Sequence, residues 1–499
     1  MAQNEAKRQR DLFGHPIGLT SLFSTEMAER FSYYGMTSIL IFYLTQQLLT
    51  PEAMPHVIGL SIVRSAFQWL LGPLSPTEFA TNITGLYTGL VYLTPFFGGL
   101  LADRLTGQRY TVVAGGLMMI AGEFMLTQTS LFFFGLLALI IGNGAFKPNI
   151  STQVGNLYAP GDNRIDRAYS IFYVGINLGA FLAPYICGTL GARMCTDDWP
   201  ASHGLCVALG QNAGWHFGFF AAGIGVSIGV LIYLMSLRHL PPDRVTSARR
   251  SGTKVKAQPL SRQDWKAIFA LVALFVPVTG FWMSYEQQYI TIALWARDYT
   301  DRIFIPGVVN FVIPAPWAQS IDPAMIFAFT PFLVWMWGRQ ARRGREPSTP
   351  IKMALGCALL GVSFCLMAGL AYATGPHGHA SWLWLLPFFT IYTLGELYLS
   401  PVGLALVARA APVQVMSMMM GFWFIATFLG STLGGMLATL WDHIPKSEFF
   451  LITAAIAFVS ALIIWSFDRP LRPILSERMG QPLTPGPDVA TEVGVGVEL

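Results

Sequence analysis

The residues best suited to chemistry gather between Glu26 and Thr37, in the sequence EMAERFSYYGMT, within an apolar run from residue 16 to residue 44. On a helix, one face presents two carboxylates, a guanidinium, a phenol and a hydroxyl: Glu26, Glu29, Arg30, Tyr33 and Thr37, with Tyr34 beside them. Ionisable groups in so apolar a segment are costly unless they face a protein interior or a wet cavity. The rest of the chain must therefore supply both a cavity and partners.

A second ionisable group of this kind is Lys147, followed by Pro148 in the sequence GNGAFKPNIST. A lysine in the middle of an apolar helix cannot easily reach the surface, and the proline kinks the helix there. We expect Lys147 to face a wet cavity and to pair with Glu26, Glu29 or a substrate carboxylate. In the alternative interpretation it only balances charge, because the two glutamates, Arg30 and Lys147 sum to zero.

Further polar groups interrupt other apolar segments. Asn177 offers a donor and an acceptor in FYVGINLGAFLAP, and Glu286 (FWMSYEQQ) and Glu396 (GELYLSP) are isolated carboxylates. From chemistry alone, each carboxylate could bind a substrate amine, hold a proton or join two halves of the protein. None of the eight histidines lies clearly in the middle of an apolar segment. Proton binding would thus depend on carboxylates, for which Glu26, Glu29, Glu286 and Asp322 are the candidates.

The composition indicates a polytopic membrane protein. The chain has 499 residues, of which 53% are hydrophobic and only 12% charged, with a mean hydropathy of +0.51. A net charge of +4 without a concentrated basic face argues against nucleic-acid binding. The charged start of the chain lacks a cleavage-site pattern, so we expect the first helix to be an uncleaved membrane anchor.

Taking about 20 apolar residues as the length of a span, the sequence predicts twelve transmembrane helices in an all-α fold. They lie near residues 17–47, 77–101, 110–128, 131–154, 167–191, 213–237, 264–295, 322–342, 350–373, 381–410, 413–440 and 447–468. Arginine and lysine are concentrated in the loops that follow even-numbered helices, which predicts that both termini are cytoplasmic.

The most polar interior stretch divides these helices into two sets of six. We expect a six-helix bundle over residues 1–237, a cytoplasmic linker over 238–263, a second six-helix bundle over 264–470 and a flexible cytoplasmic tail over 471–499.

The sequence predicts no metal site and no cofactor, since no CxxC or His/Cys spacing is present. Cys195 and Cys206 share one predicted loop and could pair if that loop faces an oxidising compartment. An integral-membrane hydrolase is a rival class of function, but the metalloprotease motif HExxH does not occur.

Between the second and third predicted helices, GGLLADRLTGQRY resembles the cytoplasmic loop motif of the major facilitator superfamily, GxxxDRxGRR. The resemblance implies that fold, and it implies that Asp103 and Arg104 form a cytoplasmic gate. An ordinary basic turn is the alternative.

EMAERFSYYGM resembles the ExxERFxYY signature of the proton-dependent oligopeptide transporter (POT) family, and FYVGINLGA its second signature. GAFKPN, GELYLSP and MMGFWF also look like that family. The resemblance implies that Glu26, Glu29 and Arg30 couple protonation to substrate and that Lys147 binds the peptide carboxylate. It further implies that Glu396 and Asn177 bind the peptide amino end, that Glu286 belongs to an outer gate, and that the side-chain pockets are lined by Tyr33, Tyr34, Tyr92 and Trp423.

Two positions depart from the family pattern. Thr37 stands where the family usually has an arginine, which weakens the assignment of Glu286. Asp322, in WAQSIDP, stands where the family has asparagine, so the outer cavity gains an acidic group. We hypothesise that Asp322 binds a proton or joins Glu286 in an outer gate. In the alternative, Asp322 is an exposed residue that caps a helix just before Pro323.

The chain is therefore predicted to be a proton-coupled symporter, not an enzyme, that imports di- and tripeptides by alternating access. A carrier of the same fold for another solute, such as nitrate or a peptide-like drug, remains the alternative. The expected partners are peptide, protons and the lipid bilayer. We expect a monomer that crosses a cell membrane several times. The expected membrane is the bacterial inner membrane.

Overall fold

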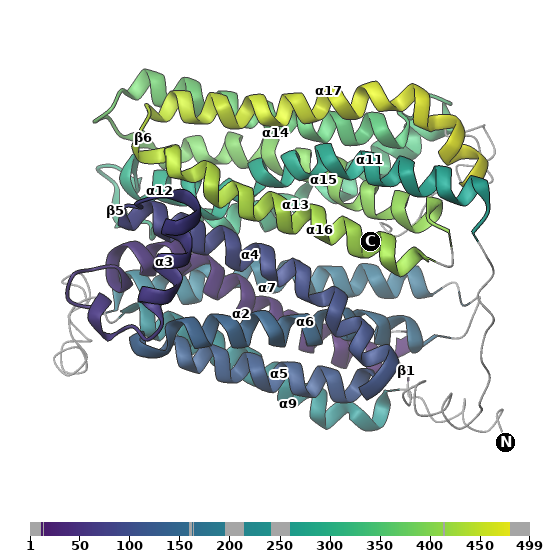
Figure 1. Cartoon of the computed structure of the whole chain (residues 1–499), viewed down its shortest axis with the longest axis horizontal. Coiled ribbons are helices and arrows are strands. Elements are labelled where there is room, and N and C mark those ends of the chain that lie inside the picture. The colour runs from purple at the N-terminus through teal and green to yellow at the C-terminus, as the bar shows by residue number, and fades with distance from the viewer. Residues whose placement is uncertain are drawn as a thin grey trace. The chain divides into compact units, whose positions relative to one another are not determined.

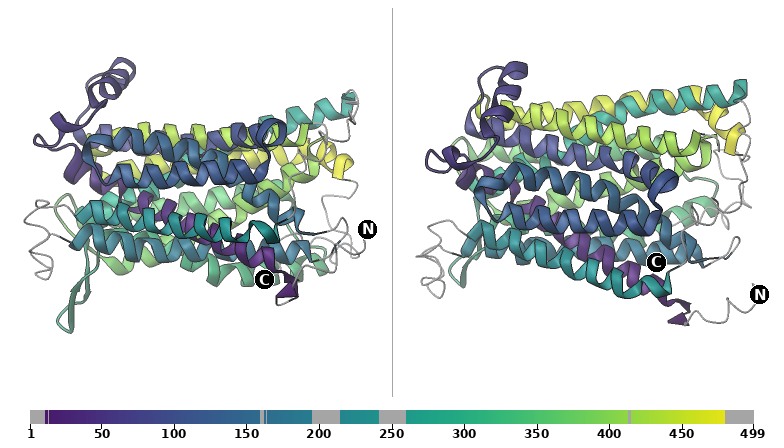
Figure 2. Two further views of the ribbon diagram at one scale, coloured as in Figure 1. Left: turned by 90° about the horizontal axis from the view of Figure 1, so that it is seen from below. Right: turned by 60° about the horizontal axis from the view of Figure 1, so that its bottom comes forward.

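The computed structural model describes residues 11–12, 14–158, 162, 164–194, 214–240, 260–412 and 415–479. The predicted pair Cys195 and Cys206, most of the predicted linker and the end of the predicted tail lie outside these residues. Figures 1 and 2 show that long helices dominate the described chain.

The helices are α2 (Ile17–Tyr43), α3 (Leu60–Leu71), α4 (Pro76–Leu101), α5 (Gln108–Leu126), α6 (Phe132–Asn156), α7 (Ile165–Arg193), α9 (Gly214–Ser236), α11 (Arg262–Tyr285), α12 (Thr291–Asp298), α13 (Ile321–Arg342), α14 (Thr349–Thr374), α15 (Leu385–Ala410), α16 (Met416–Leu437) and α17 (Lys446–Met479). Each of the twelve predicted segments contains a long helix. The segment predicted at 264–295 differs, because α11 ends at Tyr285, and a tight turn over Glu286–Tyr289 separates it from α12.

Short strands occur only near helix ends in the described residues. They are β1 (Asp11–Leu12), β2 (His15–Pro16), β3 (Thr300–Asp301), β4 (Ile303–Ile305), β5 (Val309–Val312) and β6 (Ala380–Ser381). β1 pairs with β2 and β4 with β5 in antiparallel hairpins, and β3 pairs in parallel with β6. These pairs order loops and contribute no core sheet.

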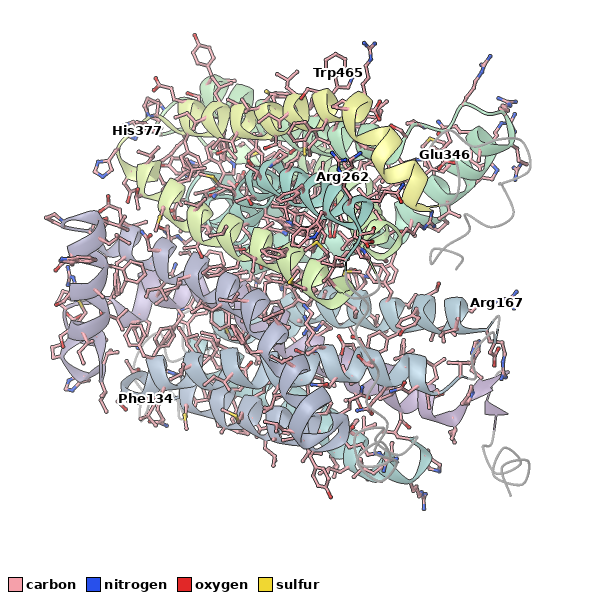
Figure 3. The ribbon with its side chains drawn as sticks, turned by 45° about the vertical axis from the view of Figure 1, so that its right-hand side comes forward. Phe134, Arg167, Arg262, Glu346, His377 and Trp465 are labelled. Carbon is pink, nitrogen blue, oxygen red and sulfur yellow. The ribbon has the colours of Figure 1, made fainter. Side chains whose placement is uncertain are left out.

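Ten helical segments in the described residues are long and apolar enough to cross a membrane. α2 and α5 are not among them. α2 is 27 residues long but contains three ionisable residues and several hydroxyl groups, which lower its mean hydropathy. Apolar side chains lie exposed along the helices, as Phe134 and Trp465 show, whereas the exposed Arg167 and Arg262 lie at helix starts (Figure 3). This pattern suits helices surrounded by lipid.

The chain divides into two compact units. The first contains the described residues of 1–61 and 94–254, and the second contains those of 62–93 and 255–495. Residues 62–93, with most of α3 and α4, therefore group with the second unit, while the end of α4 groups with the first.

In the first unit, α2 packs against α7 and α9, and α5 packs against α6 and α9. Small residues permit these close approaches. At Gly179 of α7, an added Cβ would lie 2.4 Å from the Met27 carbonyl oxygen of α2. A larger residue at this position would push apart the two helices that hold the acidic stretch in place.

In the second unit, α14 packs against α15 and α17, α11 packs against α16 and α17, and α13 packs against α15. α11 begins with a capping box, in which Ser261 accepts from the Asp264 amide while Asp264 accepts from the Ser261 amide. The N-cap of α14 is Ser348, whose hydroxyl accepts from the Ile351 amide.

Candidate functional site

The acidic stretch of α2 is buried in the first unit. Glu26, Glu29 and Arg30 are at most 2% exposed. Arg30 donates from Nε and Nη2 to the two carboxylate oxygens of Glu29, and its Nε lies 3.4 Å from Glu26 Oε1. Fork-shaped pairs of this kind are among the strongest hydrogen-bonded ion pairs in proteins. One guanidinium thus lies beside two carboxylates, and its single positive charge balances only one of them.

α6 supplies further partners to this ionic cluster. Asn143 Nδ2 donates to Glu29 Oε1 at 2.9 Å. Lys147 lies one helical turn later and interacts electrostatically with Glu26, Glu29 and Arg30. Pro148 follows it inside α6, as expected from the sequence. The four ionisable residues predicted to act together are therefore neighbours in one unit.

Aromatic rings continue the face of α2. The Arg30 guanidinium lies 5.0 Å from the centre of the Tyr33 ring, which meets the Tyr34 ring edge-on at 5.1 Å. Thr37 is fully buried and donates to the Tyr33 carbonyl oxygen at 2.8 Å. At this position, where an arginine was expected from the family resemblance, the side chain bonds to its own helix.

Asn177 is buried on α7, and its Nδ2 donates to the carbonyl oxygen of Tyr173 in the same helix at 3.0 Å. Within the described residues, this side chain bonds to its own helix and not to the ionic cluster. Asp103 and Arg104 lie in the turn Ala102–Thr106 that follows α4, and their side chains are outside the described part of the chain.

The second unit contains a buried group of carboxyls and phenols around α13 and α15. Thr393 Oγ1 donates to Asp322 Oδ1 at 2.5 Å. The Tyr285 side chain is hydrogen-bonded to Asp322 and to Glu396, and Glu396 interacts electrostatically with Asp322 and Glu286. Asp322 and Glu286 are at most 4% exposed. Three carboxyl groups therefore influence one another in this acidic cluster.

The alternative view of Asp322 as an exposed cap is wrong. Asp322 lies in the first turn of α13, whose N-cap residue is Ser320, and it is 4% exposed. Its carboxylate accepts from Thr393 of α15 instead, because the helix begins two residues earlier than the Asp-Pro pattern suggests. A role in binding a charge or a proton is thus compatible with its position.

The two remaining aromatic candidates also belong to the second unit. Tyr92, near the middle of α4, lies 6.4 Å from Trp282 between ring centres. Trp423 on α16 is 2% exposed and packs edge-on against Phe275 at 6.0 Å. Gly403 of α15 lies directly against the Trp423 ring.

Sequence reasoning missed one buried acid altogether. Glu123 of α5 is fully buried, and Ser32 of α2 donates to its Oε1 at 2.8 Å. The signal was present, because Glu123 is an isolated carboxylate in an apolar segment, as Glu286 is. Thr393 and Tyr285 were also missed, since neither residue is unusual before the fold shows what it contacts.

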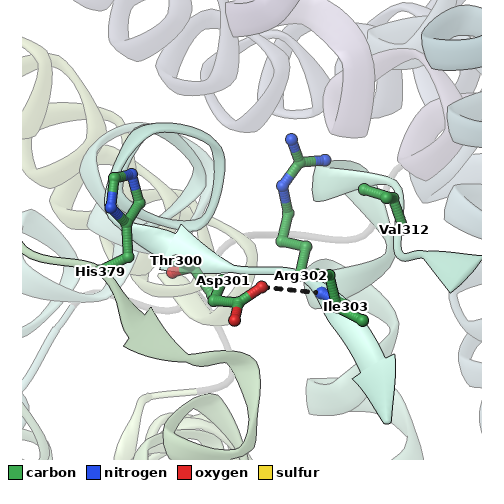
Figure 4. Close-up of a pocket in the computed structure, with 6 residues that line it drawn as sticks. All are labelled: Thr300, Asp301, Arg302, Ile303, Val312 and His379. Carbon is green, nitrogen blue, oxygen red and sulfur yellow. Dashed lines mark hydrogen bonds between the residues drawn. The ribbon is translucent and has the colours of Figure 1, made fainter. Parts of the chain in front are cut away.

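A surface hollow of about 390 Å³ lies elsewhere in the second unit (Figure 4). Its lining residues are Thr300, Asp301, Arg302, Ile303, Val312 and His379. Asp301 accepts a hydrogen bond from the Ile303 amide at 3.1 Å, so this carboxylate stabilises the turn between β3 and β4. None of the predicted site residues lines this hollow. In the described residues, no three His, Cys, Asp or Glu side chains are arranged so that they could hold a metal ion.

Several known proteins resemble this chain in sequence and in fold. The sequence profile of the POT family matches residues 109–247 and 245–456. Peptide transporter YePEPT of Yersinia enterocolitica is 31% identical, over 95% of this chain and 98% of its own length. A di-/tripeptide transporter of Lactococcus lactis is 29% identical, over 95% of this chain and 99% of its own length. A crystal structure of a peptide transporter POT variant in complex with alafosfalin has a TM-score of 0.74 and 28% identity, covering 96% of this chain and 98% of that one.

Proposed function

This chain belongs to the POT family of multi-pass membrane transporters, and from that premise we propose that it imports di- and tripeptides together with protons. The resemblance seen in the sequence is thereby confirmed, as is the expectation of a peptide-transport family of all-helical, major-facilitator type. The family is one of transporters, so the hydrolase alternative is excluded.

The observation that supports the proposal is the ionic cluster of α2 and α6. A proton added to Glu29 would remove the charge from the carboxylate that Arg30 holds with both of its donors. Arg30 would then be a buried cation with a weakened partner, a state that costs several kcal/mol unless another anion replaces it. A substrate carboxylate near Lys147 is such an anion. Protonation and substrate binding therefore favour each other in this arrangement.

The substrate class follows from the constant chemistry of short peptides. Every peptide has a carboxylate and an amine, whereas its side chains vary. Lys147 of the first unit is the proposed ligand of the carboxylate, and Glu396 with Asn177 the proposed ligands of the amine. Tyr33, Tyr34, Tyr92 and Trp423 are proposed to line the side-chain pockets, because aromatic rings accept many shapes.

Proton binding is proposed for Glu26, Glu29, Glu286 and Asp322. In the first unit, Arg30 is the cation that Glu26 and Glu29 share. The available driving force is adequate, at about 2.3 kcal/mol per charge per 100 mV and about 1.4 kcal/mol per pH unit. A single proton can therefore concentrate a neutral substrate more than about tenfold.

The membrane topology is also part of the proposal. We include α2 and α5 with the ten apolar spans, which gives twelve spans in two bundles with both termini in the cytoplasm of a bacterial cell. Asp103 and Arg104 would then lie on the cytoplasmic side as a gate, in a monomer. Cysteines placed singly in the described loops, labelled from outside by an impermeant maleimide, test this topology.

The deciding experiment is uptake of a labelled dipeptide into proteoliposomes under an inward proton gradient, with and without a protonophore. Uptake should exceed equilibrium only in the absence of the protonophore. Lys147→Ala should abolish this concentrative uptake, whereas Lys266→Ala, a change at the start of α11, should not. Competition by a panel of dipeptides, nitrate and peptide-like drugs separates the same-fold alternatives. Concentrative uptake by Lys147→Ala at the unmodified level would refute the proposed role of this lysine.

A further inference from the structure

Glu123 is a buried acid that the proposed transport cycle does not yet use. It lies on α5 and is 0% exposed. Its Oε1 accepts from the Ser32 hydroxyl of α2 at 2.8 Å, while its Oε2 is buried without a protein partner among the described residues. A fully ionised carboxylate with a bare, buried oxygen is very unfavourable, whereas the neutral acid is much less so.

The groups that face Glu123 provide no cation. α2 contributes Ser32 and the nearby Glu29 charge, and α7 contributes the thiol of Cys187. On α9, Gly223 packs against the Glu123 side chain, and His216 lies two helical turns away. The charged residue of α6 is Lys147, which interacts with Glu26, Glu29 and Arg30.

The charges of this enlarged ionic cluster do not balance. Glu26, Glu29 and Glu123 are three carboxyl groups, and Arg30 and Lys147 are two cations. With every group ionised, the buried interior of the first unit would hold one excess negative charge. One bound proton makes it neutral, which is the state that a low-dielectric interior favours.

Ser32 contacts this acid and lies one helical turn from Glu29 of the ionic cluster. Ser32 lies three residues after Glu29, so both side chains lie on neighbouring positions of the same helical face. A hydroxyl both donates and accepts, and it can therefore pass a proton between two carboxyl groups.

We propose that Glu123 is a further proton-binding residue of the transport cycle, loaded and unloaded through Ser32 in exchange with Glu29. This inference rests on the proposed function, because it needs a proton-coupled carrier. It adds one proton to the number that accompanies each substrate molecule.

The test measures how many protons move with each peptide. Proteoliposomes are loaded with a fixed dipeptide gradient at zero membrane potential, and the pH gradient that stops net peptide flux is found. Each transported proton balances about a tenfold peptide gradient per pH unit. Glu123→Gln, which preserves shape, should require a larger pH gradient than the wild-type protein, by the amount expected for one proton fewer. An unchanged zero-flux gradient in Glu123→Gln would overturn the inference.

A second pair of variants keeps the proposal testable if Glu123→Gln does not fold. Ser32→Ala removes the hydroxyl that is proposed to relay the proton, and it should slow proton-driven uptake several-fold while peptide exchange without a gradient persists. Ser38→Ala is the matched control, because Ser38 is equally buried on α2 but donates only to the Gly35 carbonyl oxygen of its own helix. Equal rates for these two variants would contradict the route. If the wild-type protein shows no proton-driven peptide uptake at all, the proposed function fails instead.

Discussion

Gly403→Ala offers a test of Trp423 as a wall of the substrate pocket without changing Trp423 itself. A Cβ at residue 403 would lie 2.1 Å from Trp423 Cη2 and 2.5 Å from Cζ3. Ordinary contact begins near 3.4 Å, so the tip of the indole must retreat by about 1.3 Å. Because Trp423 is buried against Phe275, the ring cannot move without disturbing its neighbours. Overpacking of this kind costs about 1–3 kcal/mol of stability.

Two measurements follow from that displacement. Thermal unfolding in detergent should show the loss of stability. The ranking of dipeptides by their KM for uptake should also change, with bulky side chains affected more than alanine, because the pocket wall has moved. Trp423→Phe in the Gly403→Ala background should recover much of the stability and of the wild-type ranking of dipeptides, since phenylalanine lacks the part of the indole that meets the new methyl group.

Gly369→Ala is the matched control for this experiment. Residue 369 is also a helical glycine, but an added Cβ there meets no atom within 4 Å. This change should leave transport unaltered and raise stability by about 0.5–1 kcal/mol, because alanine favours the helix. The reasoning about residue 403 is refuted if Gly403→Ala and Gly369→Ala behave alike. If Gly403→Ala loses stability but retains the wild-type ranking of peptides, Trp423 is a core residue and not a pocket wall.

Three further changes test other parts of the structure. Asp322→Asn keeps the oxygen that accepts from Thr393, so it should cost no more than about 1 kcal/mol of stability while lowering proton-driven accumulation; full accumulation would leave Asp322 with a structural role only. Ser348→Ala removes the N-cap of α14 and the 2.5 Å hydrogen bond to Asp468. Thermal unfolding should show a loss of about 1–3 kcal/mol of stability. The control Ser466→Ala, at an exposed position, should lose less than about 0.5 kcal/mol. Hydrogen bonds from Arg164 lower the pKa of Asp162, so this carboxylate favours the folded state above its unfolded pKa and less so as pH falls; Arg164→Gln should move its NMR titration midpoint up toward the ordinary value of 3.8.

The ionic cluster of the first unit could be predicted because its signal is local. Glu26, Glu29 and Arg30 lie on one face of an apolar helix. Exposing ionisable side chains to lipid is so unfavourable that they must lie in an enclosed site. The cation on α6 was recognised by the same rule. What the sequence could not supply is the bond from Asn143 to Glu29, since the two residues are 114 positions apart and asparagine is common at helix contacts.

Other features depended on tertiary contacts that leave no local pattern. Glu123 stands out only through its hydrogen bond with Ser32, which lies 91 residues earlier in the chain. The break between α11 and α12 contains neither glycine nor proline, so nothing marks it in the sequence. In the structure, Gln287 in this turn donates to the Gly434 carbonyl oxygen of α16 and accepts from Thr291. These bonds connect the turn to α16 and to the start of α12 through the side chain of Gln287.

The two units hold their buried carboxyl groups in different ways, and the difference has consequences for how a proton acts in each. Glu29 is held by a cation, so adding a proton to it weakens that ion pair and leaves Arg30 with the longer 3.4 Å contact to Glu26. Asp322 is held by neutral groups of the described residues, the hydroxyls of Thr393 and Tyr285, and not by a cation. Asp322 can therefore gain or lose a proton without leaving a cation behind. Under the proposed proton coupling, a proton bound in the first unit would change ion pairs, whereas a proton bound by Asp322 would change only the net charge of the acidic cluster.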